Sequence, residues 1–188
     1  SAIASNLAKG MALEDAVPHG VSYVSNSTRV TYPFGLTNTV YDRFDLRSYT
    51  NNNGSMSWLN GWQEQGESDG YNIGDVQVFV DPPYASYALR VQGSTNSAWR
   101  SANLSGHNSA FLSFTYRRYA LDGASDYVDV QISTNGWVSS NVLVRLQGAA
   151  ADTSYLATNI EISAYISTNT SVKFISSPTL AADEGVWF

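Results

Sequence analysis

The sequence predicts an all-β fold, an antiparallel jelly-roll β-sandwich with an extended N-terminal arm. The first observation is a series of short segments in which apolar and polar residues alternate with a period of two, the pattern of a strand with one buried face. The second is turn chemistry rich in Gly, Asn, Asp, Ser and Pro, which separates these segments at intervals of about 8–14 residues. Strands of this kind that return through short turns are antiparallel, and many of them in one chain form a two-layer sandwich.

Each expected strand puts its apolar side chains on one face. In residues 127–133, for example, Val128, Val130 and Ile132 share a face, and Asp129 lies on the opposite one. The expected strands are 21–34, 75–80, 87–92, 111–118, 127–133, 142–146 and 171–176.

The first forty residues are expected to form an arm, and residues 41–188 the sandwich domain. Residues 5–16 have the only helical spacing in the chain, and Pro18 ends that pattern, so the arm is predicted to be a short helix or coil followed by one strand. The composition changes near residues 36–40, which places the boundary there.

Composition favours a secreted or cell-surface β-protein. Charged residues make up only 14% of the 188 residues, whereas the chain has 12 Tyr, 5 Trp and 7 Phe. The net charge of −6 and the absence of a Lys/Arg cluster argue against a nucleic-acid partner. No apolar run is long enough for a membrane span, and without Cys there are no disulfides or thiolate metal sites.

A cluster of charges at residues 116–133 predicts a β-hairpin with a salt-bridged, solvated end. Arg117 and Arg118 end the first expected strand, and Asp122, Asp126 and Asp129 lie across the turn and into the next. Opposite charges across an antiparallel pair stabilise it modestly. The alternative is a Ca²⁺ loop built on the oxygen-rich turn between Asp122 and Asp126, which the two arginines oppose.

No catalytic motif is visible, and the chain is expected not to be an enzyme. His19 and His107 are the only histidines, and neither stands beside a nucleophile or metal-binding motif. No strand carries two carboxylates at alternate positions, the arrangement by which a glycosidase on a sandwich would present its acid pair.

From Tyr41 onward, the chain resembles a jelly-roll module of bacterial secreted and cell-surface proteins, loosely related to MAM and carbohydrate-binding-module sandwiches. The resemblance lies in the segments YDRFDLRSYTNNNGSMSW (41–58), WQEQGESDG (62–70), YALRVQG (87–93), SANLSGHNSAFLSFTYRRYALDGASDYVDVQIS (101–133), IEISAYI (160–166), VKFISSP (172–178) and DEGVWF (183–188).

This resemblance implies a structural Ca²⁺ between the first and last strands, with Asp42 or Asp45 as the entry ligand. The usual C-terminal acid would follow Phe188, so Asp183 or Glu184 would take its place. Asp45 could instead cap a turn or pair with a nearby arginine. Family members usually continue past Trp187–Phe188 and lack an arm, so a shortened last strand and an exposed sheet edge are expected here.

Aromatic side chains near turns are the candidate ligand-binding residues, because planar rings pack on the apolar faces of sugars and neighbouring polar groups bind the hydroxyls. The alternative for each ring is a place in the core or over a sheet edge. The candidates are Trp62, Trp99, Trp137, Tyr71 and Tyr84.

Two functions follow. The first is a non-catalytic extracellular binding or adhesion module for carbohydrate or another surface ligand. The second is a structural subunit of an extracellular fibre or sheath, in which the 21–34 segment is donated as a strand to another copy. The residues expected to insert are Tyr23, Val24, Val30, Tyr32 and Phe34.

Overall fold

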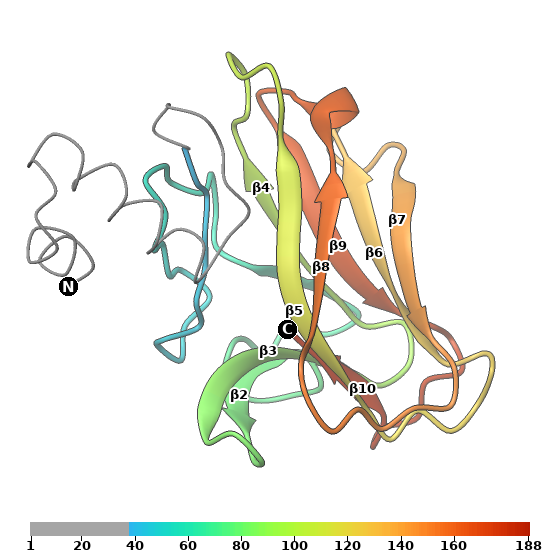
Figure 1. The fold of residues 1–188 in the computed structure, drawn as a ribbon. Coiled ribbons are helices and arrows are strands. Elements are labelled where there is room, and N and C mark those ends of the chain that lie inside the picture. Colours follow the sequence, from blue (N-terminus) through green and yellow to red (C-terminus); the bar gives the residue numbers. More distant parts are fainter. Residues whose placement is uncertain (1–37) are drawn as a thin grey trace, which may run out of the picture. The chain divides into compact units, whose positions relative to one another are not determined.

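Ten strands form two antiparallel five-stranded sheets in the computed structural model, which describes residues 38–188 (Figure 1). The expected helix at 5–16, the expected strand at 21–34 and its inserting residues Tyr23, Val24, Val30, Tyr32 and Phe34 lie outside the described residues. The predicted all-β, antiparallel sandwich is confirmed.

The strands divide evenly between the sheets. The first sheet has the order β1 (Gln63–Gln65), β4 (Ser97–Ala102), β9 (Thr170–Ser176), β6 (Tyr127–Ser133), β7 (Asn141–Gln147). The second sheet has the order β2 (Gln77–Asp81), β3 (Ser86–Gln92), β10 (Gly185–Trp187), β5 (Phe111–Tyr119), β8 (Leu156–Glu161). A single 3₁₀ turn, η1 (Ser163–Tyr165), joins β8 to β9.

The core lies between the two sheets and uses the faces that the alternation predicts. Val128 and Val130 of β6 face Leu89 and Val91 of β3 across a buried cluster. Phe174 of β9 stacks on Phe188, with ring centroids 3.9 Å apart, and so joins the two layers. Burial of these apolar side chains is the main force that holds the sheets together.

Six expected strands are confirmed as β2, β3, β5, β6, β7 and β9, with ends shifted by at most two residues. Four strands were not expected. Apolar alternation did not predict β4, because one of its inward-facing positions holds Arg100, between Ala98 and Ala102. β1 and β10 have only three residues each, and β8 is an edge strand with mostly exposed side chains.

The predicted hairpin at 116–133 is wrong. β5 pairs with β10 and β8 in the second sheet, whereas β6 pairs with β9 and β7 in the first, so the connection crosses between the layers. Strand patterns and turn chemistry do not tell a hairpin from a crossover of this length, because both leave one face of each strand buried.

The charges of that segment therefore do not pair with each other across a hairpin. Arg117 binds Asp81 of β2, and Arg118 binds Asp152, while Asp129 binds Arg145 of β7. Asp126 accepts a hydrogen bond from the Gly123 backbone N–H and closes the turn.

The last strand, β10, has only three residues and lies inside the second sheet, between β3 and β5. Phe188 continues it by exchanging two backbone hydrogen bonds with Leu89, of 2.8 and 3.0 Å. β10 covers only part of each neighbour: it pairs with β5 at Arg117–Tyr119, whereas β8 pairs with β5 over Phe111–Tyr116.

Consequently, among residues 38–188, two stretches of backbone lack a strand partner on the side toward β10. They are residues 86–88 of β3 and 112–115 of β5, called here the open β3–β5 edges. Tyr87 lies on the same face of β3 as the core residues Leu89 and Val91, yet it is 38% exposed. The core is thus less well covered beside these edges.

Candidate ligand-binding face

The outer face of the first sheet carries the aromatic and polar groups that are best placed to bind a ligand. Since Ala98, Phe174 and Val130 face the core, the alternate positions on β4, β9 and β6 face outward. The register places Trp99, Lys173 and Gln131 side by side in one row across the three strands.

Trp137 joins this row from the loop that follows β6. Its ring lies 6.0 Å from that of Trp99 in an edge-to-face arrangement at 71°. Trp137 has a φ of +68°, an uncommon backbone conformation for a side chain of this size. The loop is fixed by Ser133, whose Oγ accepts hydrogen bonds from the backbone N–H groups of Asn135 and Trp137.

Lys173 lies beneath the tryptophan pair. Its Nζ is 4.2 Å from the centroid of the Trp137 ring and donates a hydrogen bond of 3.1 Å to Oε1 of Gln65. The side chain is largely buried, and burial lowers the pKa of the ammonium. Lys173 is not among the residues predicted from the sequence, although the chain contains only one other lysine, Lys9.

One end of this face is charged and the other carries small hydroxyls. Asp129 accepts two hydrogen bonds from Arg145, whose guanidinium lies 3.6 Å from the centroid of Tyr127. At the opposite end, Ser101 and Ser171 are buried and share a hydrogen bond of 2.7 Å. Apart from these buried hydroxyls, the face combines two partly exposed indole rings with amide and cationic groups, which suits a polar ligand with some apolar surface.

Trp99 and Trp137 are the two predicted ligand-binding residues that the structure brings together. Tyr71 and Tyr84 are 42% and 40% exposed, but they lie elsewhere. The ring of Tyr71 packs edge-on against Tyr49, and the Tyr84 hydroxyl donates to the carbonyl of Thr153.

Trp62 is in the core rather than on a surface, with only 6% of it exposed. Its ring stacks on Phe174 with centroids 5.7 Å apart. Its indole N–H donates a hydrogen bond of 3.0 Å to Asp42. We therefore do not include Trp62 in the candidate face.

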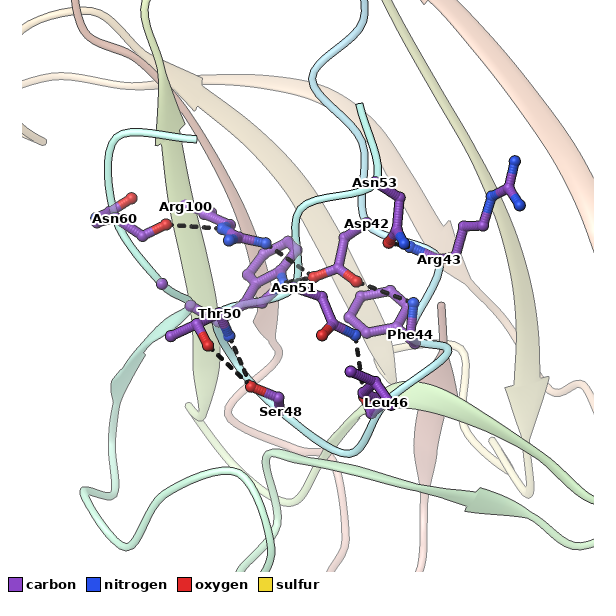
Figure 2. Close-up of polar contacts among 12 residues, drawn as sticks. Asp42, Arg43, Phe44, Leu46, Ser48, Thr50, Asn51, Asn53, Asn60 and Arg100 are labelled. Atoms are coloured by element: carbon purple, nitrogen blue, oxygen red, sulfur yellow. Dashed lines mark hydrogen bonds and ion pairs between the residues drawn. The ribbon is translucent and has the colours of Figure 1, made fainter. Parts of the chain in front are cut away.

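Asp42 and Asp45 organise the segment that enters the sandwich (Figure 2). Asp42 forms a buried ion pair of 2.8 Å with Arg100, and its other oxygen accepts the Phe44 N–H. Burial raises the pKa of Asp42, and the hydrogen bonds from Phe44 and Trp62 and the charge of Arg100 oppose that rise.

Asp45 accepts side-chain hydrogen bonds from Asn51 and Asn53. Asp42 has little capacity to bind a metal cation, because the Arg100 guanidinium already neutralises it. Asp183 has no such partner among residues 38–188 and is exposed. The Ca²⁺ prediction at Asp42, Asp45 and Asp183 remains a prediction.

Two other acidic groups in residues 38–188 have carboxylate oxygens close enough to share a metal ion. They are Glu64 with Glu67 and Asp69, and Asp122 with Asp126 and Glu184. In the second group, each carboxylate oxygen of Glu184 accepts one backbone N–H hydrogen bond, from Asp122 and from Ala181. Exposed acids are common without a metal, whereas Asp126 and Glu184 of the second group are buried.

Comparison with known proteins identifies neighbours in structure alone. No protein-family model and no curated protein matches the chain. A CBM15 xylan-binding module has 10% identity and a TM-score of 0.45, with 69% of this chain and 90% of the module covered. A CBM22 xylan-binding domain has 12% identity and a TM-score of 0.47, with 81% and 92% covered.

The K1 adhesin domain of Lys-gingipain from Porphyromonas gingivalis has 13% identity and a TM-score of 0.44, with 75% of this chain and 95% of that domain covered. These neighbours are carbohydrate-binding modules, which the sequence resemblance names, and an adhesin domain. Identities and TM-scores this low carry no argument about the ligand. Separately, no helix in residues 38–188 has the length and apolar character needed to cross a membrane.

Proposed function

We propose that the chain is a non-catalytic binding module that recognises carbohydrate through the outer face of the first sheet. The observation that carries this proposal is the meeting of Trp99 and Trp137, with ring centroids 6.0 Å apart, on a face lined by polar side chains. Partly exposed indole rings provide a surface for the apolar face of a sugar, and the row through Gln131 supplies hydrogen-bonding groups.

Affinity electrophoresis against a panel of soluble polysaccharides tests this proposal. Trp99→Ala and Trp137→Ala should each abolish retention of the protein in a gel that contains a bound polysaccharide. Tyr119→Ala is the matched control, because Tyr119 is an exposed aromatic residue of the second sheet. If both tryptophan variants are retained like the parent protein, this face is not the binding site.

We also propose that the module is extracellular or at the cell surface. A structural Ca²⁺ ion is a separate proposal with its own test. The chain owes its polarity mainly to uncharged side chains, which suits a module exposed to a polysaccharide. Thermal unfolding in the presence of Ca²⁺ and of a chelator tests the ion, because a ligand that binds only the folded state raises the unfolding temperature.

A second candidate is a structural subunit of an extracellular fibre or sheath, and the open β3–β5 edges support it. An extended segment placed there would bond to the backbone of residues 86–88 and 112–115 and cover the partly exposed Tyr87. The 21–34 segment has the β-branched and aromatic content of such a strand. Donated by a neighbouring copy, it would make a head-to-tail contact that propagates.

A further inference from the structure

Lys173 is the one lysine in residues 38–188, and no carboxylate of that region binds it. Four ion pairs are formed there, and all of them use arginine. The carboxylate of Asp129, on the neighbouring strand, is held through both oxygens by Arg145. Within residues 38–188, a largely buried cation is thus left without an anion, although the whole chain has 16 acidic and 10 basic residues.

This arrangement is costly for the free protein. Burial of an ammonium group without an opposite charge is unfavourable, and the hydrogen bond to Gln65 and the contact with the Trp137 ring offset only part of the cost. An ammonium group has three N–H donors, so one remains after Gln65 and Trp137 are satisfied. The Trp137 indole N–H is a second buried donor with no acceptor among the described residues.

Both groups belong to one neighbourhood, because Lys173 Nζ lies 4.2 Å from the centroid of the ring that carries this indole N–H. Carboxylate and sulfate groups are acceptors only and carry the charge that would neutralise Lys173. Neutral sugar hydroxyls would satisfy the donors but not the charge.

We propose that this face selects acidic polysaccharides, in which a carboxylate or sulfate of one sugar binds Lys173 while a sugar ring packs against Trp99 or Trp137. This inference rests on the proposed carbohydrate-binding function and deepens it by naming the ligand class. The net charge of −6 repels a polyanion, but charges farther than about 8 Å away are screened at physiological salt, so the local contact with Lys173 decides the preference.

The test uses the full chain and matched polysaccharides at physiological salt. Glucuronoxylan and polygalacturonate are each compared with their carboxyl-reduced forms, and a sulfated galactan with its desulfated form, by isothermal titration calorimetry. At least one acidic polymer should bind about tenfold or more tightly than its neutral counterpart, the gain expected of a hydrogen bond to a charged group. The pair that shows the preference identifies carboxylate or sulfate as the source of the charge.

Lys173→Gln should abolish this preference, whereas Arg43→Gln should retain it. The control removes the same charge from an exposed arginine whose side chain points away from the other labelled residues in Figure 2. In the unmodified protein, the preferred acidic polymer should also slow acetylation of Lys173, measured by mass spectrometry with Lys9 as the internal reference. This second readout does not depend on the folding of a variant.

The outcomes separate the two proposals. Equal binding of acidic and neutral forms, or a preference that survives Lys173→Gln, overturns the acidic-ligand inference and leaves the carbohydrate-binding function standing. Failure of every polymer, acidic or neutral, to bind the unmodified protein overturns both.

Discussion

Arg100 and Asp42 form the most deeply buried ion pair of the entry segment, with each side chain only 2% exposed. Arg100 also donates to the carbonyl of Asn60 and packs over the Trp58 ring at 4.7 Å. At the scale of single residues, this pair decides whether residues 41–62 stay docked on the sandwich, because four partners of these two side chains come from that segment: Phe44, Trp58, Asn60 and Trp62.

Replacement of Arg100 by Leu should therefore destabilise the protein by about 3–5 kcal/mol, since it leaves Asp42 charged, buried and unpaired. The double variant Arg100→Leu with Asp42→Leu should recover part of the loss, because no charge is then left unpaired. Urea unfolding of the two variants and the parent measures the difference. A double variant as unstable as the single one would show that the ion pair is not the cause.

Protonation of Asp152 should account for much of the stability that the protein loses in acid. It accepts hydrogen bonds from the Arg118 side chain and backbone, and these hold the pKa of its carboxyl below the ordinary value. Because the pKa is lower in the folded state, the pair stabilises the protein fully above the unfolded pKa of about 3.9 and less as the pH falls through the folded pKa.

Asp152→Asn should consequently lower the free energy of unfolding near neutral pH and change it little in strong acid. Urea unfolding from about pH 6 down to about pH 2.5 measures the two curves, which should begin to converge below the unfolded pKa and meet as the pH falls through the lower, folded pKa. Parallel curves over that whole range would exclude Asp152 as a source of the acid sensitivity.

β10 is the element on which the second sheet depends. It has only three residues, yet it joins β3 to β5 in the middle of the sheet. Gly185 permits this close approach, because a Cβ there would lie 2.7 Å from the Val91 carbonyl oxygen. Backbone atoms cannot yield as a flexible side chain can.

Gly185→Ala should thus cost about 1–3 kcal/mol, the range found when extra atoms are forced into a packed site. The urea midpoint should fall while the dependence of unfolding free energy on urea stays the same, as in a folded state that is strained but intact. An unchanged midpoint would mean that β10 can shift without loss of its pairing with β3.

At the scale of the whole molecule, the sequence predicts which face of a strand is buried better than it predicts which strands pair with each other. Alternation identifies which side chains of β6 face the core, because that pattern is local. It does not show that β5 and β6 lie in different sheets, nor that β10 is internal, because both depend on pairing between distant residues. The candidate site divides in the same way: aromatic content pointed to Trp99 and Trp137, but only the register places Lys173 beside them.

The open β3–β5 edges make the last prediction one about assembly. If the 21–34 segment of one copy completes the second sheet of the next, deletion of residues 1–35 should leave folded monomers that form no filaments. Negative-stain electron microscopy and sedimentation velocity of the full chain and the deletion variant measure this. A synthetic 21–34 peptide should bind the deletion variant and raise its unfolding temperature, because it pairs only with the folded sheet. A peptide of the same composition with the alternation scrambled should do neither. Filaments of the deletion variant, or equal binding of both peptides, would show that assembly does not use this segment.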